Sequence, residues 1–283
     1  MFVNIIGYGY VGSATGYLCT KSGVQFCTCD INKRESNGAL ANFDNIRDLV
    51  THSEQNNDTN VYFVSVPTPS KPSGECDTSI VESVIQSLYE FHHKRTIVYI
   101  KSTVQPGTCR MFPNTPNFTI VFCPEFLREK THLDDMYNAK FVLLGTSDKM
   151  RRDVNETTTN LFKELYKHNK DIQIVYRTYE ECEMFKNTIN TYLAVKVWYF
   201  NKVSEMCEKL GVSYTSLHDL FKLEPRIGDS HTHVPGHDLK RGFGGSCLPK
   251  ETRSMRYMQQ KLGLNDKVLQ EILQENELFR EKF

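Results

Sequence analysis

The chain has 283 residues, which is enough for two domains of ~100–200 residues each. Its 34 Lys and Arg residues balance 34 Asp and Glu residues, so no net positive charge would draw it to nucleic acid or to an anionic membrane. The nine cysteines show no paired framework, the N-terminus lacks the basic segment of a signal peptide, and no run of about 18 apolar residues occurs, so the sequence predicts a cytoplasmic protein without a membrane span.

The first apolar run, residues 2–6, is typical of a buried strand and is followed at once by a glycine motif, Gly7-Tyr8-Gly9-Tyr10-Val11-Gly12. A helix is expected from this motif to about residue 21. Gly7 would permit the tight turn, Gly9 would let a pyrophosphate approach the backbone at the helix N-terminus, and Gly12 would let the helix pack closely on the strand. The stretch therefore predicts a dinucleotide site.

A second strand, residues 24–30, ends in Asp30. A carboxylate at this place accepts hydrogen bonds from ribose hydroxyls and repels a 2′-phosphate, which favours NAD over NADP. Lys33 and Arg34 would soften that preference, although we interpret them as solvated loop charges. Cys27 and Cys29 share one face of the strand, and we interpret both as packing residues.

The same pattern continues with apolar runs at 61–66 and 96–102, separated by a helix expected over 78–92. Runs of this kind are typical of parallel strands covered on both faces. Small polar residues follow them: Thr68 after the first, Ser102 and Thr103 after the second. Ligands of doubly wound sheets bind outside the carboxyl ends of the strands, so these three side chains are predicted to line the cofactor.

Three further strands (119–123, 141–147 and 171–176) and a helix over 149–168 would complete the sheet. The tail after the first of them carries Glu125 and Glu129, which would share a helical face if this tail forms a helical turn. The predicted fold is α/β: a Rossmann-type doubly wound sheet over 1–178, followed by a helical domain over 179–283.

Residues 179–210 contain no Gly or Pro and predict one long helix that ends at Gly211. Glu183, Lys186 and Asn190 are spaced so that they lie along one side of it. A Glu–Lys pair on a solvated face would explain the first two. Asn is a modest helix former, so Asn190 indicates that its amide has a partner.

An irregular stretch, residues 224–242, contains Arg226, His231, His233, His237 and Asp238. Histidines beside an acid raise the possibility of a metal site. No fixed helical spacing supports it, and the sequence predicts none.

The stretch GFGGSCLPKE, residues 242–251, presents Cys247 after three glycines that can take positive φ. Pro249 and the periodic run after it predict a helix beginning near Cys247, and a helix N-terminus favours a thiolate. Cys247 is therefore a candidate nucleophile, the alternative being a buried inert thiol. Residues 266–283 predict a last helix whose apolar stripe needs a neighbour, which favours a homodimer or a higher homo-oligomer.

Taken together, GxGYVG, VPTP, STVQPGT, CPEFLRE, ExxKNTIN, PRIG and GFGGSCLPKE occur in an order that resembles the UDP-glucose/GDP-mannose dehydrogenase family. The resemblance spans nearly the whole chain. It implies an NAD-dependent enzyme that oxidises the C6 alcohol of a nucleotide sugar, best represented by UDP-glucose, to a carboxylate through two hydride transfers.

The resemblance also implies residue roles. Cys247 would capture the aldehyde and carry a thioester, Lys186 and Asn190 would steady the oxyanion, Thr103 would position water and Glu125 would activate it. Glu251 stands where the family usually has Asp. The predicted cofactor contacts are Gly7, Gly9, Tyr10, Val11, Gly12, Asp30, Thr68, Ser102 and Glu129; the predicted substrate contacts are Glu125, Phe126, Leu127, Lys186, Asn190, Arg226 and Gly244.

Two features set the sequence apart from that family. The chain ends about where a second nucleotide-binding domain is expected, which predicts a short form that lacks it, and the segment from Arg226 to Cys247 is longer than in many members. Two alternatives remain open: a β-hydroxyacid dehydrogenase, which needs no cysteine, and a binding protein that no longer turns over.

Overall fold

A computed structural model describes residues 2–32, 34, 36, 38–147 and 152–281. The chain forms two compact units, the first made of residues 1–69 and 77–186, the second of 70–76 and 187–283. These units do not test where a domain boundary lies, so the division at residues 178 and 179 stays a prediction. Within the described residues, no helix is both long and apolar enough to cross a bilayer.

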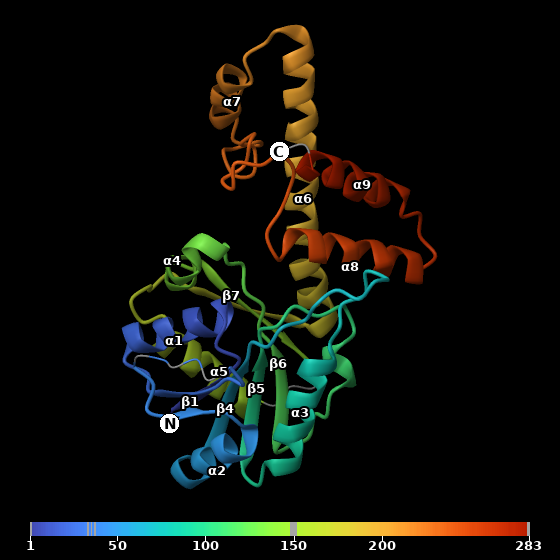
Figure 1. The fold of residues 1–283 in the computed structure, drawn as a ribbon. Helices are drawn as coiled ribbons and strands as arrows, with labels where there is room; N and C mark the ends of the chain where they lie inside the picture. The colour runs from blue at the N-terminus through green and yellow to red at the C-terminus, as the bar shows by residue number, and fades with distance from the viewer. Residues whose placement is uncertain (1, 33, 35, 37, 148–151, 282–283) are drawn as a thin grey trace. The chain divides into compact units, whose positions relative to one another are not determined.

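The first unit is built on an eight-stranded sheet in the order β3-β2-β1-β4-β5-β6-β7-β8 (Figure 1). The strands are β1 (Val3–Ile6), β2 (Phe26–Cys29), β3 (Asn42–Phe43), β4 (Thr59–Val64), β5 (Arg95–Ile100), β6 (Phe118–Phe122), β7 (Phe141–Thr146) and β8 (Gln173–Thr178). All neighbours pair in parallel except β6 and β7. Strand order reverses at β1, which lies between β2 and β4, and this is where a ligand crevice is expected.

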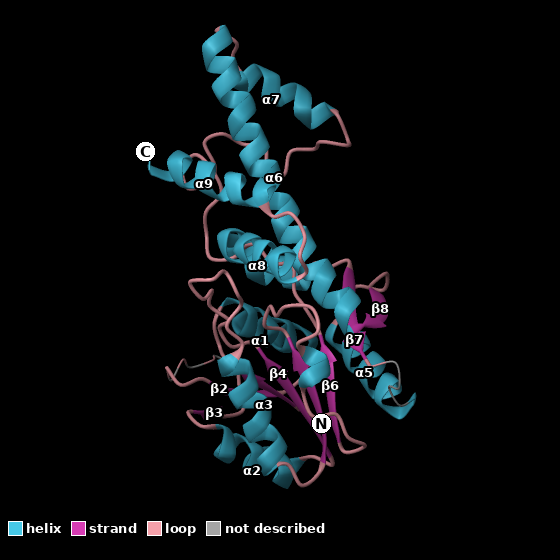
Figure 2. Ribbon diagram, turned by 90° about the vertical axis from the view of Figure 1, so that its right-hand side faces the viewer, coloured by secondary structure: helices cyan, strands magenta, loops and turns pink. Residues whose placement is uncertain are grey.

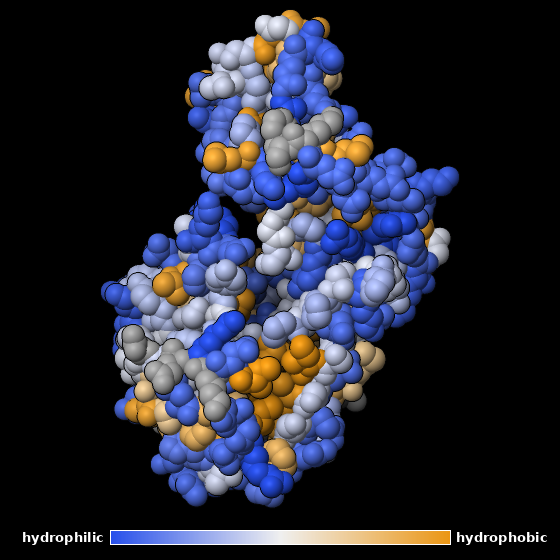
Figure 3. All heavy atoms as spheres, viewed as in Figure 1, coloured by the Kyte–Doolittle hydropathy of each residue, from blue (hydrophilic) through white to orange (hydrophobic). Residues whose placement is uncertain are grey.

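Helices cover both faces of this sheet. Two of them, α2 (Ile46–Asn56) and α3 (Ser79–Phe91), pack on the face that receives Ile6 and Val64. The opposite face, which receives Ile5 and Phe63, is covered by α1 (Tyr10–Ser22), α4 (His132–Tyr137) and α5 (Arg152–Leu165). Consecutive residues of a strand thus pack on opposite faces of the sheet, because side chains alternate between the two faces along a strand. In Figure 3 an apolar patch beside α3 marks where part of one layer reaches the surface.

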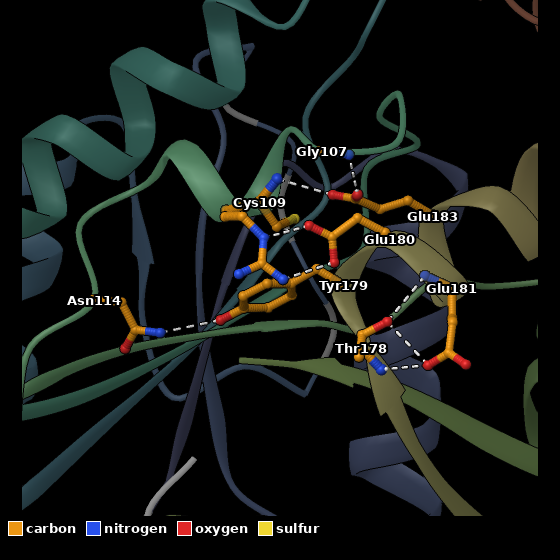
Figure 4. Close-up of polar contacts among 9 residues, drawn as sticks. Gly107, Cys109, Asn114, Thr178, Tyr179, Glu180, Glu181 and Glu183 are labelled. Atoms are coloured by element: carbon orange, nitrogen blue, oxygen red, sulfur yellow. Dashed lines mark hydrogen bonds and ion pairs between the residues drawn. The ribbon is translucent and has the colours of Figure 1, made fainter. Parts of the chain in front are cut away.

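Helix α6 (Tyr179–Leu210) begins directly after β8, and its start is closely held (Figure 4). Glu181 accepts hydrogen bonds from the Thr178 amide and hydroxyl, both at 2.9 Å, and donates its own amide to that hydroxyl at 3.3 Å. This reciprocal arrangement is a capping box, and the sequence Thr-x-x-Glu encodes it. The Tyr179 hydroxyl donates to the Ile120 carbonyl at 2.7 Å. The first turn of α6 is therefore anchored to the sheet, three turns ahead of Asn190.

The second unit combines the rest of α6 with α7 (Tyr214–Leu223), α8 (Leu248–Lys261) and α9 (Lys267–Glu281), and its long connection is the loop between α7 and α8 (Figure 2). Its small core contains Ala194 of α6, Phe243 of the loop before α8, and Leu269, Ile272 and Leu273 of α9. The expected long helix, its end at Gly211 with φ +67°, and the helix after Cys247 are all confirmed.

Several elements differ from the sequence-based expectation. Strand β3 and helices α2, α4 and α7 were not anticipated. Residues 123–128 form an extended loop before a short 3₁₀ turn (Glu129–Thr131), so the idea that Glu125 and Glu129 share a helical face is wrong. The first residues of the helix expected from 149 lie outside the described residues, and α5 is described from Arg152.

Candidate functional site

The turn between β1 and α1 can be built only with glycine at two positions. Gly7 has φ +83°, and a Cβ on it would lie 2.7 Å from the Ser65 carbonyl oxygen. A Cβ on Gly12 would lie 2.0 Å from the carbonyl oxygen of Gly7. Gly9 is the extended N-cap of α1, and a Cβ there would meet only the Arg34 side chain at 3.5 Å. The loop thus leaves a backbone approach at the helix N-terminus, which is what a pyrophosphate needs.

Asp30 braces this loop from the end of β2. Its Oδ2 accepts from the amide of Tyr8 at 2.7 Å and its Oδ1 from that of Asn32 at 2.8 Å. The side chain is buried, so its orientation is set before any ribose arrives. Arg34 is exposed, as expected for a solvated loop charge, and its guanidinium lies at the open side of Gly9. Lys33 lies outside the described residues.

Two other predicted cofactor contacts lie at the ends of the next strands. Thr68 and Ser102 are buried, and the Ser102 hydroxyl donates to the Val66 carbonyl at 2.7 Å. Thr103, the residue after Ser102, is half-buried. This places small hydroxyl side chains at the carboxyl ends of β4 and β5, next to the strand-order reversal at β1.

Glu129 lies near the start of α1, although residues 123–128 before it do not form the helical turn that was expected. The Tyr10 hydroxyl hydrogen-bonds to its carboxylate, and this bond, together with the negative charge, raises the pKa of Tyr10. Tyr10 is the first residue of α1. Glu129 therefore stands beside the glycine loop even though residues 123–128 are not helical.

Glu125 and Lys186 form the most buried ion pair of the site, and we refer to them as the buried pair. The Lys186 ammonium donates to Glu125 twice, at 2.6 Å to the carbonyl oxygen and at 3.1 Å to Oε1. Their side chains are 3% and 9% exposed. The other carboxylate oxygen accepts from the Leu127 amide at 2.6 Å, and the Phe126 ring lies 5.4 Å from the ammonium. Burial at this depth excludes the solvated-face interpretation of Lys186.

A cavity of about 200 Å³ adjoins Glu125, and its lining includes Phe126, Leu127, Lys101 and Cys123. Lys101 was missed by sequence reasoning because it sits inside a strand-end run of apolar residues. It is buried, with its ammonium 3.5 Å from the Cys123 carbonyl oxygen. A larger cavity, about 490 Å³, lies between α5 and β8 and is lined by none of the predicted site residues.

The side-chain amide of Asn190 has a hydrogen-bond partner, as its position within a helix indicated. Its Nδ2 donates to Glu251 Oε2 at 2.8 Å, and Glu251 is buried in the first turn of α8. The longer side chain at 251, where the resembled family has Asp, therefore still contacts Asn190.

The residues from Gly242 to Cys247, which we call the cysteine loop, turn on two glycines with positive φ: Gly242 at +70° and Gly245 at +76°. Gly244 does not need positive φ; a Cβ there would lie 2.6 Å from the Arg280 guanidinium. Phe243 anchors the loop, since its amide donates to Asn276 Oδ1 at 2.7 Å. Asn201 Oδ1 also accepts from the Gly242 amide, at 3.1 Å, so the start of the loop is held by two asparagine side chains and its course is shaped by its glycines.

Cys247 is the N-cap of α8 and lies on the surface, with its sulfur 3.6 Å from the Ser246 hydroxyl. The structure describes all nine cysteines, and the other eight are buried. Burial raises the pKa of Cys19 and Cys29 to about 12, which keeps those thiols protonated at neutral pH. Accessibility therefore singles out Cys247, and the buried-thiol interpretation of it is wrong.

Arg226 lies on the surface and its guanidinium is held by Glu224, at 2.7 Å from Nε and 2.9 Å from Nη2. The backbone next to it is fixed from α6, because the Lys196 ammonium donates to the Ile227 carbonyl at 2.6 Å. The predicted site residues are thus divided: the glycine loop and the buried pair belong to the first unit, and Asn190, Arg226, Glu251 and the cysteine loop belong to the second.

Comparison with known proteins gives two domain matches that follow one another along the chain. Residues 39–170 match the NAD-binding domain of the UDP-glucose/GDP-mannose dehydrogenase family, and residues 180–278 match its central domain. A UDP-glucose 6-dehydrogenase of Rickettsia conorii is 26% identical over 98% of this chain and 66% of its own length. The chain therefore spans about two thirds of the length of this curated relative.

Solved structures show the same fold. A UDP-glucose dehydrogenase from the hyperthermophilic archaeon Pyrobaculum islandicum superposes with a TM-score of 0.77 at 24% identity, covering 98% of this chain and 68% of the other. A 3-hydroxyisobutyrate dehydrogenase of Mycobacterium tuberculosis superposes with a TM-score of 0.71 at 16% identity, covering 99% and 94%. At these identities the likeness concerns the fold alone.

Proposed function

The chain belongs to the UDP-glucose/GDP-mannose dehydrogenase family, and from this membership we propose that it oxidises the C6 alcohol of a nucleotide sugar, with UDP-glucose as the first candidate, to a carboxylate in two NAD-dependent steps. The observation that carries the proposal is the exposed Cys247 at the N-cap of α8. A simple alcohol oxidation needs no cysteine, whereas oxidation through to the acid is helped by a nucleophile that holds the aldehyde.

The glycine loop fits a dinucleotide, because the close backbone contacts at Gly7 and Gly12 leave no room for a Cβ and make the turn tight, while a Cβ at Gly9 would meet no backbone atom within 4 Å among the described residues. Gly9, Tyr10 and Val11 would offer backbone amides to the pyrophosphate, and Asp30 would accept from the adenosine ribose. Thr68, Ser102 and Glu129 would contact the rest of the bound NAD, beyond its pyrophosphate and adenosine ribose. Two NAD molecules, bound one after the other, would each supply a nicotinamide that accepts one of the two hydrides.

Cys247 would act in its thiolate form on the aldehyde carbon. The sulfur forms a bond to that carbon, the carbonyl π electrons move to oxygen, and the thiohemiacetal alcohol results after protonation. Oxidation of that alcohol leaves a thioester on Cys247. Water then attacks the thioester carbon, the carbon–sulfur bond breaks, and the thiolate leaves with the acid as product.

The buried pair and its neighbours would supply charge and protons around this carbon. Lys186 brings a positive charge that steadies the oxyanion formed when sulfur or water attacks. An amide carries two N–H donors, and one of those on Asn190 is directed by Glu251, so the other can point to the same oxyanion. Glu125 would take a proton from the attacking water, which Thr103 would position.

Binding of the sugar nucleotide is proposed to involve Phe126, Leu127, Arg226 and Gly244, in addition to the catalytic side chains. Arg226 would serve the site of a second copy of the chain in a homodimer or higher oligomer, and the protein would work in the cytosol.

The test is the number of NADH molecules formed per sugar consumed. The purified chain is mixed with NAD and, in separate reactions, with UDP-glucose, GDP-mannose and UDP-N-acetyl sugars, and NADH absorbance is compared with product quantified by chromatography. Two NADH per sugar are expected with one of these substrates.

The other outcomes discriminate between the alternatives. One NADH per molecule with a hydroxyacid, and none with the sugar nucleotides, would identify a β-hydroxyacid dehydrogenase, the class to which the similar Mycobacterium tuberculosis structure belongs. No NADH with any substrate, alongside intact NAD binding, would identify a binding protein.

A further inference from the structure

Two histidines and an aspartate come together beside helix α7, in a part of the second unit that the proposed reaction does not use. His218 lies on α7, and Asp229 and His233 lie on the loop that follows it. The Nε2 atoms of His218 and His233 are 3.5 and 3.2 Å from the same oxygen, Oδ1 of Asp229. One ligand atom from each of the three residues lies within 4.8 Å of the others.

The backbone that carries these residues is held by bonds independent of the three side chains. The Tyr214 hydroxyl donates to the Thr232 carbonyl at 2.6 Å, and the Thr232 hydroxyl donates to the Asp229 carbonyl at 2.6 Å. From α6, Lys196 donates to the Ile227 carbonyl, also at 2.6 Å. The loop is thus folded back onto α7, which fixes the backbone of the site, while the side chains of Asp229 and His233 lie on the surface, 58% and 39% exposed.

We propose that His218, Asp229 and His233 form a binding site for a divalent metal ion of the zinc class. Zinc takes imidazole nitrogen and carboxylate oxygen at ~2.0–2.2 Å in a tetrahedral arrangement, so neighbouring ligand atoms stand roughly 3.4 Å apart. The two separations from Asp229 Oδ1, 3.5 and 3.2 Å, lie on either side of that value, and the two histidine ligand atoms lie within 4.8 Å of each other. Three protein ligands leave the remaining position to water. Calcium and magnesium prefer sets made of oxygen alone, so two imidazoles disfavour them.

The electrostatic setting is compatible with metal ligation. Lys222 lies on the same helix as His218 and carries a positive charge. Lys222 is itself paired with Asp219 at 3.0 Å. Asp229 supplies one negative charge to the site, which favours a cation.

One existing contact would compete with the metal. The Nε2 of His218 is 2.9 Å from the Thr232 hydroxyl oxygen. Since that hydroxyl gives its hydrogen to the Asp229 carbonyl, the imidazole Nε2–H is the donor in this contact. For a metal to bind at Nε2, that hydrogen must move to Nδ1, which gives the other tautomer of the neutral ring, and the hydrogen bond to Thr232 is lost. Thr232 can thus be removed as a hydrogen-bond partner without removing a ligand.

The sequence predicted no metal here because His231, His233, His237 and Asp238 show no regular spacing. In the structure only His233 of these four belongs to the cluster, while Asp238 is paired with Arg280 at 2.6 Å. The other two ligands, His218 and Asp229, come from positions that no motif connects. His237 is near, with its ring centroid 5.4 Å from that of His233, but it is not among the three ligands.

The experiment measures metal binding by the full chain, purified without a polyhistidine tag and stripped with a chelator. Zn²⁺ is titrated calorimetrically, bound metal is counted by elemental analysis after dialysis, and Co²⁺ serves as a spectroscopic probe of a low-symmetry nitrogen and oxygen environment. We expect one Zn²⁺ per chain, with Ca²⁺ and Mg²⁺ failing to displace it. Each of His218→Ala, Asp229→Asn and His233→Asn should weaken binding by more than about 100-fold, beyond the effect of losing an outer partner.

Two matched controls keep the ligands and change their surroundings. His231→Asn removes an imidazole from the same loop at a position with φ +63°, which Asn tolerates. Thr232→Val removes the hydrogen bond to His218. Both should retain one Zn²⁺ per chain. If the buried His218 variant fails to fold, the two surface ligands Asp229 and His233 still decide the matter.

The proposal is overturned by any of three results: no stoichiometric Zn²⁺ in the wild type, binding that persists undiminished in Asp229→Asn and His233→Asn, or equal loss in His231→Asn. Equal affinity for Ca²⁺ would contradict the zinc class. None of these readouts depends on the dehydrogenase reaction, so failure here and failure of the proposed function are distinguishable.

Discussion

The buried pair and the cysteine loop represent opposite ways of holding a reactive group. Glu125 and Lys186 lie beneath the surface, each tied to the other and to the surrounding backbone, so their positions follow from the packing of the first unit. Cys247 lies on the surface at the end of a loop shaped by glycines with positive φ. The comparison shows that the buried pair is held in place by the packing around it, whereas the position of the Cys247 thiol depends on the backbone conformation of the cysteine loop.

This division has a chemical logic. A charge that steadies an oxyanion is effective when it is preorganised in a dry environment, where it need not reorganise during the reaction. A nucleophile must instead reach its carbon and leave it again, and burial would suppress its thiolate form, as it does at Cys19. The comparison predicts that variants of the buried pair disturb stability and those of the cysteine loop disturb chemistry.

The largest effect is expected from Cys247→Ser. Loss of the thiolate should lower uronate formation by about 10⁴-fold or more, because a serine hydroxyl is a far weaker nucleophile at neutral pH. The melting temperature and NAD affinity should stay at wild-type values, since the side chain is exposed and its sulfur lies 3.6 Å from the hydroxyl of the neighbouring Ser246. Steady-state assays and calorimetry check this, and Ser246→Ala is the matched control. Wild-type uronate yield from Cys247→Ser would contradict the thioester route.

Lys186→Met should show the opposite pattern and unfold the protein more easily. Removing one partner of a buried ion pair leaves an uncompensated charge and costs about 3–5 kcal/mol. Denaturant unfolding of the variant measures the loss. Replacing both partners, with Glu125→Gln alongside Lys186→Met, should recover part of it, because no lone charge remains buried. A double variant less stable than either single one would show that the pair does not act as a unit.

Glu183 tests burial at the start of α6, where its carboxylate accepts from the amides of Gly107 at 2.6 Å and Cys109 at 2.8 Å. A Gln side chain keeps one acceptor, so Glu183→Gln should destabilise the fold by about 1–3 kcal/mol at acid pH. The amide that loses its acceptor would then be left without its present partner.

The pH dependence of that difference has a definite sign. Burial raises the pKa of Glu183 above its ordinary value of 4.5, against the lowering effect of the two amides. The folded state therefore binds this proton more readily than the unfolded state, and the contribution is most favourable below pH 4.5 and declines as pH rises through the raised pKa. Unfolding free energies of the two proteins, measured from pH 4 to 8, should converge with rising pH. Divergence would mean that the hydrogen bonds outweigh burial.

The smallest effect is expected from a substitution at Gly245, which tests whether the conformation of the cysteine loop matters for turnover. A side chain at φ +76° costs about 1–2 kcal/mol, so Gly245→Ala should strain the loop and lower turnover more than it lowers the melting temperature. Gly245→Asn is the control, because Asn adopts this conformation more readily. Equal turnover in wild type and Gly245→Ala would show that loop conformation does not present the thiol.

Much of the fold was predictable, because local patterns and long-range packing agree. The glycine motif between a strand and a helix, the parallel apolar runs and the uninterrupted stretch over 179–210 each encode an element that tertiary packing then keeps. The short strand β3 and helix α4 escaped because two and six residues are too few to show a period.

The sequence indicated which residues are candidates for the site, but not which contacts they make. Sequence spacing placed Glu183 and Lys186 on one side of α6, yet it could not show that the first is bound by amides 74 and 76 positions away and the second by Glu125. Burial of a charge depends on what packs over it. The same reason hid Lys101, and it hid the cluster of His218, Asp229 and His233, whose members lie on two elements.

The most direct test of the account is to look for the acyl-enzyme on Cys247. Glu125→Gln, which lacks the base proposed to activate water, is mixed with NAD and UDP-glucose, quenched in acid and examined by intact-mass and peptide mass spectrometry. The account predicts a glucuronyl nucleotide attached through a thioester to the peptide containing Cys247, and no attachment in the double variant with Cys247→Ser. NADH formation without any adduct on that peptide, or an adduct that persists when Cys247 is replaced, would contradict it.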